Sequence, residues 1–236
     1  MKESLKEWAE NLIPWERDWF LFLNGSDSIF LDNIMWTLSG RWVWIPLYLF
    51  VLFVFFYKTQ KKEAILMTVF LIAIFALCDQ FSSGFMKPFF ERFRPSRHPD
   101  FEEIVTIVNG YTGGRFGFIS GHATNAFGFA VFLSMVFRYR WVTIVTLIWA
   151  LLQGYTRIYL GVHFITDVIG GVIAGTLIAF ILYGILIVVR QKLFHKTYRE
   201  RTHLYSEQHG KIFSAGMAGY LIFVIIFAQI LKTLPY

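Results

Sequence analysis

The sequence has a single cysteine and few charged residues, and each shortage excludes a class of protein. Cys78 alone permits neither an intrachain disulfide nor a metal site built from several cysteines. Only 16% of the 236 residues are charged, whereas an ordinary soluble domain carries about 25%. The composition therefore excludes a typical water-soluble domain.

Large apolar side chains take the place of charge. Hydrophobic residues make up 56% of the chain and aromatic residues 19%, with 27 Phe and 8 Trp. Such a composition is typical of lipid-facing helices and of aromatic belts at membrane surfaces. The net charge of +6 is also found in nucleic-acid-binding proteins, but here the basic residues lie between apolar runs. We expect a lipid bilayer with anionic head groups as the partner, and no nucleic acid.

The first 28 residues form a segment of their own. They hold no short apolar core followed by a small-residue cleavage site, so no signal peptide is predicted. Apolar and charged positions alternate over residues 5–23, which predicts an amphipathic helix at the membrane interface. An ordinary packed helix would show the same pattern. The positions are Leu5, Trp8, Leu12, Trp15, Trp19 and Phe20 among Lys6, Glu7, Glu10, Glu16, Arg17 and Asp18.

Six apolar segments approach the length of roughly 20 residues that a membrane-spanning helix needs. They cover 42–57, with a start a little earlier, and then 64–86, 118–137, 141–156, 168–189 and 212–231. We predict an all-α polytopic membrane protein, a bundle of about six transmembrane helices with an N-terminal amphipathic helix. Residues 1–236 would form one domain.

The connections between these segments predict an orientation. Membrane helices alternate in direction, so 58–63, 138–140 and 190–211 share one face. That face is strongly basic and by the positive-inside rule is cytoplasmic; its residues are Lys58, Lys61, Lys62, Arg138, Arg140, Arg190, Lys192, Lys196, Arg199, Arg201 and Lys211. The connections 87–117 and 157–167 then face the periplasm or the cell exterior from the cytoplasmic membrane.

Two features inside the apolar runs need an explanation. Gly171 and Gly175 fit the small-xxx-small motif and predict close packing of two helices. Asp79 is a carboxylate in a membrane segment, which suggests a function. We expect instead a buried hydrogen bond to a neighbouring helix.

Polar residues concentrate in the two outward connections. Lys87 is followed seven residues later by Arg94-Pro95, and Ser120-Gly121-His122 begins the third apolar segment. Arg157 precedes His163 by six residues, and Asp167 follows His163 by four. All three pieces fall on the same face of the membrane. Taken singly, each residue fits an interfacial anchor or an ordinary helix cap; the combined spacing favours a site.

The residue types suit a phosphate group. Lys87, Arg94 and Arg157 supply three positive charges of the kind that stabilise phosphoryl transfer. A helix that starts at a glycine presents unpaired backbone N–H groups, which bind anions.

Two histidines could perform the chemistry. His163 and Asp167 lie one helical turn apart, so the carboxylate could hold one ring proton while the other ring nitrogen attacks phosphorus. His122 is available to protonate the departing oxygen.

Three other classes of protein compete with a phosphatase. Ser120, His163 and Asp167 could form the triad of an intramembrane serine hydrolase, but an acyl-transfer site does not need three cations. An anion or lipid transporter would place its basic residues near the middle of the membrane. A soluble vanadate-dependent haloperoxidase would lack six apolar helices.

The three motifs together resemble the signature of the type-2 phosphatidic acid phosphatase superfamily. The resemblance is Lys87-x6-Arg94-Pro95, then Ser120-Gly121-His122, then Arg157-x5-His163-x3-Asp167, so it spans residues 87–167, and the six-helix layout extends it over most of the chain. Ile119 stands where the family usually has Pro, which puts the loop geometry in question, and Thr156 stands where Ser usually precedes the arginine.

The resemblance implies a role for each residue. His163 would be the nucleophile that forms a phosphohistidine, Asp167 would orient it, and His122 would be the general acid and later the base. Lys87, Arg94, Ser120, the Gly121 backbone and Arg157 would bind the phosphate. The family works without metal, so no cofactor is expected.

The substrate class follows from the resemblance, but the individual lipid does not. Candidates are lipid A phosphates, undecaprenyl diphosphate, phosphatidylglycerol phosphate and phosphatidic acid, the first two being favoured by an outward site with a basic rim. Four residues lie near the motifs without belonging to them, and we expect head-group contacts or plain surface charge for them: Arg92, Arg97, His98 and Arg115.

Overall fold

The computed structural model describes residues 2–194 and 204–234 and is all-helical there, with one isolated β-bridge between Phe93 and Phe116. The predicted fold class is confirmed. Lys196, Arg199 and Arg201 of the predicted basic face lie outside the described residues. The main helices are α1 (Lys2–Glu10), α2 (Ile13–Leu23), α3 (Ile29–Ser39), α4 (Ile45–Phe56), α5 (Lys61–Asp79), α6 (Lys87–Phe90), α7 (Gly121–Phe137), α8 (Arg140–Tyr159), α9 (Ile165–Phe194), α11 (Glu207–Ile226) and α12 (Ala228–Leu231).

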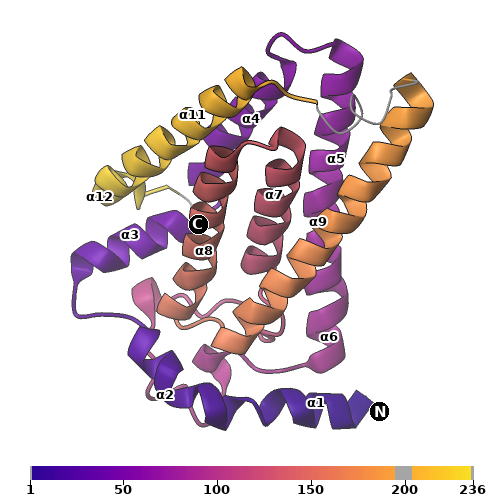
Figure 1. The fold of residues 1–236 in the computed structure, drawn as a ribbon. Coiled ribbons are helices and arrows are strands. Elements are labelled where there is room, and N and C mark those ends of the chain that lie inside the picture. The colour runs from indigo at the N-terminus through magenta and orange to yellow at the C-terminus, as the bar shows by residue number, and fades with distance from the viewer. Residues whose placement is uncertain (1, 195–203, 235–236) are drawn as a thin grey trace.

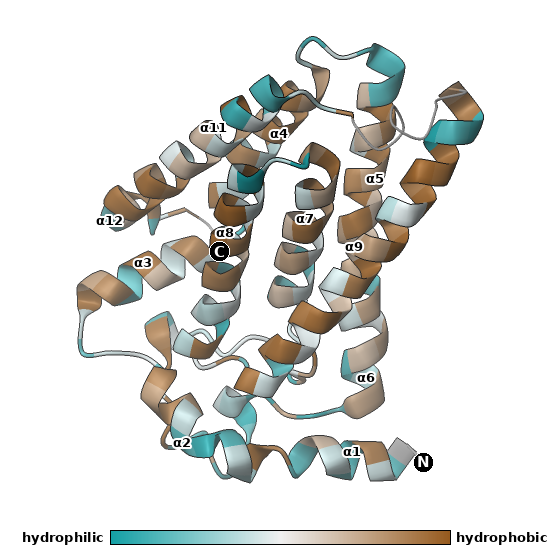
Figure 2. Ribbon diagram, viewed as in Figure 1, coloured by the Kyte–Doolittle hydropathy of each residue, from teal (hydrophilic) through white to brown (hydrophobic). Residues whose placement is uncertain are grey.

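The long helices form a bundle around α7 and α8 (Figure 1). Apolar residues cover α4, α5, α9 and α11, while hydrophilic residues gather at the loops on one end and on α1 and α2 at the other (Figure 2). Large side chains on the outer helices remain exposed, among them Val69 and Ile72 of α5 and Leu177 and Ile181 of α9. This pattern suits lipid contact around the bundle.

The number of membrane spans is not confirmed as six. Within the described residues, three helices are long and apolar enough to span a bilayer: 61–90, 165–194 and 207–226. A fourth span results if α3 and the helix 42–56 count as one, although they meet at an angle of 67°. Helix α7 is apolar but shorter, at 17 residues. It also lies inside the bundle, where its length need not match the bilayer.

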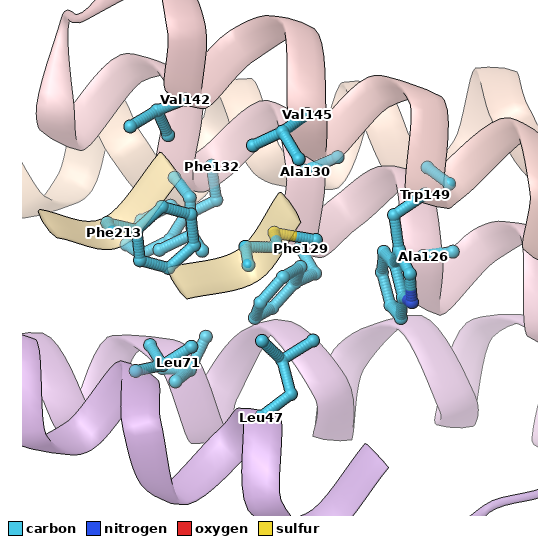
Figure 3. Close-up of a cluster of buried hydrophobic side chains, with 14 of the residues drawn as sticks. Leu47, Leu71, Ala126, Phe129, Ala130, Phe132, Val142, Val145, Trp149 and Phe213 are labelled. Carbon is cyan, nitrogen blue, oxygen red and sulfur yellow. The ribbon is translucent and has the colours of Figure 1, made fainter. Parts of the chain in front are cut away.

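The core packs around aromatic side chains of α7 and α8. Phe129 and Phe132 are fully buried, and Phe129 and Trp149 meet with ring centroids 5.2 Å apart (Figure 3). Leu47 of α4 and Leu71 of α5 close the cluster from one side (Figure 3). This packing fixes α7 and α8. Predicted site residues lie in the first turn of α7 and in the last turn of α8.

The predicted N-terminal helix is broken into α1 and α2. Pro14 explains the break, because its ring would clash with the carbonyl of Glu10, the last residue of α1, and it has no N–H to donate. Ile13, Glu16 and Phe20 are buried on one face of α2, whereas Trp15, Trp19 and Phe22 are exposed. Both helices lie across the end of the bundle (Figure 1).

Close packing at Gly171 and Gly175 is confirmed. A Cβ atom on Gly175 would lie 2.2 Å from the backbone oxygen of Thr124 in α7, and one on Gly171 would lie 2.7 Å from that of Ser120. The two glycines therefore allow α9 to approach α7, which begins at the predicted site.

We predict that Gly175→Ala destabilises the protein, whereas Gly184→Ala does not. The new methyl group at 175 would push α9 from α7, and overpacking of this kind costs about 1–3 kcal/mol. A Cβ atom on Gly184, in the same helix, meets nothing within 4 Å. Thermal unfolding in detergent should show a lower midpoint for Gly175→Ala only; equal midpoints would contradict the packing argument.

Candidate active site

A cavity of about 640 Å³ brings together most of the predicted site residues. Six of the eight line it: Lys87, Arg94, Gly121, His122, Arg157 and His163. The other two, Ser120 and Asp167, are fully buried behind its wall. The cavity continues past Leu52 of α4 and Leu71, Ile72 and Phe75 of α5, so it has a cationic part and an apolar part.

Two of the three cations are fixed by polar contacts. The Arg94 Nε–H donates to the carbonyl of Phe116 at 3.1 Å. Arg157 is 1% exposed; its guanidinium donates to the Ser39 hydroxyl and lies over the ring of Tyr111, 5.6 Å from the centroid. Because the chain already holds these planar groups, a bound anion would find them in place.

Lys87 follows a π-helical turn (Gln80–Met86) inserted at the end of α5. Its ammonium donates to the Ser83 hydroxyl at 3.3 Å, and Ser83 in turn donates to Asp79 at 3.4 Å. Our expectation for Asp79 was wrong: the carboxylate is exposed, lines the cavity, and bonds to its own helix. The π turn widens the helix there, as is common at functional sites.

The start of α7 is capped by Ser120. Its hydroxyl accepts from the backbone N–H of Ala123 at 3.5 Å, and its own N–H donates to the Asp167 carbonyl at 2.9 Å. Ile119, in the usual place of a proline, is buried without disturbing this cap. Because Ser120 points away from the cavity into the cap, the arrangement disfavours a serine nucleophile.

Gly121 brings the first turn of α7 against the cation. A Cβ atom there would lie 3.6 Å from Lys87 Nζ and 3.2 Å from the Ser82 hydroxyl oxygen. The next residue, His122, faces the cavity with Nε2 3.3 Å from the carbonyl oxygen of Ser39. Ser39 ends α3, so the bend between α3 and α4 forms one wall of the site.

His163 and Asp167 meet as predicted. His163 Nδ1 lies 3.3 Å from Asp167 Oδ2, and the same oxygen accepts from the Phe164 N–H at 3.0 Å. Burial first, and then the charges of Arg94, Lys87 and Arg157, lower the pKa of His163 well below its ordinary value. This shift favours the neutral imidazole at pH 7, and Nε2 lies away from the carboxylate that Nδ1 contacts.

Glu16 and Arg92 complete the site, and sequence analysis missed both. Arg92 donates to Asp167 Oδ1 at 2.8 Å and to Glu16 Oε1 at 2.7 Å, and all three side chains are fully buried. Glu16 also accepts from the Thr166 N–H at 2.7 Å. The expectation of a surface role for Arg92 is wrong. The sequence held one signal for this buried ion pair: Glu16 is a carboxylate on the same helical face as the apolar residues Ile13 and Phe20.

The other three basic residues near the motifs, Arg97, His98 and Arg115, differ in their exposure. Arg97 and Arg115 are exposed, as expected for surface charge. His98 is 9% exposed and pairs with Glu10 at 3.4 Å, so the expectation of a surface role is wrong for it. In the described ranges 2–194 and 204–234, no group of three or more His, Cys, Asp or Glu side chains is arranged to hold a metal ion.

Comparisons with known proteins agree with this geometry. A family model described as the PAP2 superfamily matches residues 68–190. The lipid A 4'-phosphatase of Porphyromonas gingivalis is 43% identical over 185 residues, 78% of this chain and 78% of that protein. The lipid A 4'-phosphatase of Bacteroides thetaiotaomicron is 39% identical over 156 residues, 66% of this chain and 69% of that protein.

A solved structure is also similar. It is the transmembrane PAP2-type phosphatidylglycerolphosphate phosphatase of Bacillus subtilis, which is 28% identical in sequence. The match covers 67% of this chain and 77% of that one, with a TM-score of 0.50.

We predict that His163 titrates below pH 6.5, the ordinary midpoint for histidine. Arg94→Gln should move the midpoint upward, because removing a nearby positive charge favours the imidazolium. Arg97→Gln is the control, since Arg97 is exposed and does not line the cavity. NMR of histidine-labelled protein in micelles, with His163→Gln to assign the signal, measures the midpoints. A wild-type midpoint of 6.5 or higher would contradict the burial argument.

Proposed function

This chain belongs to the PAP2 superfamily, and from that premise we propose that it is a lipid phosphatase, which hydrolyses a phosphate or diphosphate ester on a membrane lipid. The observation that supports this most is the composition of the cavity. Lys87, Arg94 and Arg157 meet at one part of it, and apolar side chains of α4 and α5 line another. An amphiphile with an anionic head and a hydrocarbon tail has the same two parts.

The three cations would bind the phosphate oxygens. The backbone N–H groups at the start of α7, at Gly121, would add neutral donors. Ser120 would act through its cap, which holds that first turn in place, rather than by direct contact. Charge developing on the equatorial oxygens would then be stabilised by groups that are already ordered.

In the first step, His163 Nε2 would form a bond to phosphorus as the bond from phosphorus to the lipid oxygen breaks. Asp167 would keep the proton on Nδ1 and stabilise the positive charge that the ring acquires. His122 would enter this step as the imidazolium and give its proton to the departing lipid oxygen. The products of this step are the dephosphorylated lipid and a phosphohistidine.

In the second step, water would release the phosphate. His122, now neutral, would accept a proton from the water as its oxygen attacks phosphorus. The bond between phosphorus and His163 Nε2 would break, and inorganic phosphate would leave with both histidines in their starting forms. No metal takes part in this proposal, because side-chain cations supply the charge.

We place the site at the periplasmic or outer face of the cytoplasmic membrane. The opposite end of the bundle carries Lys58, Lys61, Lys62, Arg138 and Arg140 in its short loops and in the first turns of α5 and α8, as the positive-inside rule requires of a cytoplasmic face. The exposed aromatic residues of α2 would then lie in the outer interface.

Among lipids, we favour a lipid A phosphate. Two relatives, which match 78% and 66% of this chain, are named lipid A 4'-phosphatase. Phosphatidylglycerol phosphate is the alternative that the Bacillus subtilis enzyme supports, and undecaprenyl diphosphate and phosphatidic acid remain candidates. Phosphate release by the purified protein from these four lipids tests the proposal.

We predict that this release proceeds in EDTA with no added metal. Arg and Lys side chains do the work that a divalent ion does in other phosphatases, so a chelator removes nothing that the reaction needs. Loss of activity in EDTA and its return with Mg²⁺ would refute the metal-free mechanism. No release from any of the four lipids would refute the proposed function.

The two histidines should respond differently to the leaving group. A lipid alkoxide leaves poorly and needs a proton from His122, whereas a nitrophenolate does not. His122→Ala should therefore lose about 10²–10⁴-fold in single-turnover rate on the lipid and much less on p-nitrophenyl phosphate. His163→Ala should be inactive on both and form no acid-labile phosphoprotein. Equal losses on both substrates for His122→Ala would reassign the acid.

Cysteine labelling should reveal the orientation. A reagent that cannot cross the membrane should label Glu103→Cys in intact cells or spheroplasts and leave Gln60→Cys unlabelled until the membrane is opened. Both positions are exposed, at opposite ends of the bundle, and the native Cys78 is buried. The reverse pattern would put the site in the cytoplasm.

A further inference from the structure

Two buried polar atoms next to the cavity have no hydrogen-bond partner. They are the side-chain oxygen of Asn125 in α7 and the indole N–H of Trp149 in α8. Trp149 is 2% exposed, and both residues line the cavity. Figure 3 shows the indole nitrogen on the side of Ala126, towards the start of α7. Buried polar groups in folded proteins are nearly always paired. The Asn125 oxygen and the Trp149 N–H are therefore an acceptor and a donor to which a ligand could bind.

Their depth in the bundle separates them from the phosphate site. At a rise of 1.5 Å per residue, Asn125 lies about 4.5 Å after His122 on α7, and Trp149 about 12 Å before Arg157 on α8, so both lie deeper in the bundle than these two residues. On α5, Phe75 lies roughly 18 Å from Lys87 by the same measure. The two unpaired atoms therefore lie deeper in the bundle than the cations and beside the apolar part of the cavity.

We propose, resting on the proposed lipid phosphatase activity, that Asn125 and Trp149 form a subsite for the polar linkage between head group and acyl chain. The Trp149 N–H would donate to an acyl carbonyl oxygen. The Asn125 oxygen would accept from a hydroxyl on the acyl chain. The preferred substrate class is then an acylated lipid phosphate with a hydroxyacyl chain. A polyprenyl phosphate, whose chain has neither group, could not pair these atoms and would leave them desolvated.

Three lipid phosphates that share one head group test each contact separately: a hydroxyacyl lipid, its acyl analogue without the hydroxyl, and the ether analogue without the carbonyl. Wild-type protein should prefer the hydroxyacyl to the acyl lipid, and the acyl to the ether lipid, each by about tenfold in kcat/KM, the effect of one hydrogen bond to a buried group. Trp149→Phe should abolish the preference for acyl over ether. Asn125→Leu should abolish the preference for hydroxyacyl over acyl.

Thr68→Val is the matched control, because Thr68 lines the same cavity but its hydroxyl already donates to the Ala64 carbonyl at 3.0 Å. It should keep both preferences. Equal loss on all three lipids in the variants, or no preference in the wild type, would overturn the subsite. Failure of the wild type to release phosphate from any lipid would instead be a failure of the proposed function.

A second and independent observation concerns Glu16. The buried cluster of Glu16, Arg92 and Asp167 has two carboxylates for one guanidinium. With both carboxylates ionised its formal charge is −1, so Asp167 is not fully neutralised by Arg92 and can still polarise His163. Without Glu16 the cluster would be a neutral pair, and Arg92 would draw Asp167 away from the imidazole.

We infer that Glu16 is a positioning residue for catalysis, which makes the N-terminal helices part of the active site. Glu16 also fixes Thr166, one residue before Asp167, through its N–H and its hydroxyl at 2.7 and 2.6 Å. Glu16→Gln removes the charge and places an amide N–H₂ against these donors. We expect a loss of roughly 10–100-fold in the single-turnover rate constant, the range found for the carboxylates that orient metal-ligating histidines, with KM unchanged because the phosphate cations remain.

The matched control is Glu63→Gln. Glu63 forms a separate buried ion pair, with Arg190 at 2.7 Å, at the far end of the bundle. A merely structural role for Glu16 predicts that both variants lower the fraction of folded protein and leave the single-turnover rate constant of the remainder unchanged. Positioning predicts a slower rate constant for Glu16→Gln alone. Equal rate constants in Glu16→Gln and wild type would overturn the inference.

Discussion

The arrangement of the site depends on one buried charge, the guanidinium of Arg92. An arginine cannot lose its proton in a protein, so burying it requires anions at contact distance. Arg92 is fully buried, and Glu16 and Asp167 supply those anions from α2 and α9. Segments distant in sequence are thereby joined at one point. The same pairing places Asp167 beside His163. One contact, between Arg92 and Asp167, therefore both neutralises the buried guanidinium and holds the carboxylate that orients the histidine.

A second constraint is that the site must work where water, membrane and protein meet. Its cations are Arg and Lys side chains bonded to backbone carbonyls and hydroxyls, such as Arg94 to Phe116 and Lys87 to Ser83. The two arginines keep their charge when buried, whereas burial and the nearby positive charges lower the pKa of His163 and favour its neutral form. One environment therefore gives the phosphate site its charge and the histidine its free electron pair.

The apolar runs were enough to predict the fold class, and the motifs named residues that the fold brings together. Lys87, Arg94, Gly121, His122, Arg157 and His163 all line one cavity, because their motifs lie at helix ends and loops at one end of the bundle. Spacing in the sequence could not predict hydrogen-bond partners that meet only through tertiary packing. Glu16 and Ser39 are 76 and 118 positions in sequence from Arg92 and Arg157, the residues they bind. Asp79 lines the cavity and bonds to Ser83 of the π turn that follows it, a local geometry that the apolar pattern does not show.

The residues that the motifs did not predict have a common origin. Glu16, Ser39 and Arg41 come from the first 41 residues and touch the site or the network behind it, yet the matched family region begins at residue 68. The bend of 67° between α3 and the helix 42–56 brings Ser39 to both His122 and Arg157. The catalytic side chains therefore belong to the shared core, while the N-terminal part shapes the wall around it and, through Glu16, supports Asp167. Because the catalytic groups occupy one part of the cavity and the rest of it would contact the lipid, sequence differences between relatives with different lipids should concentrate in that wall.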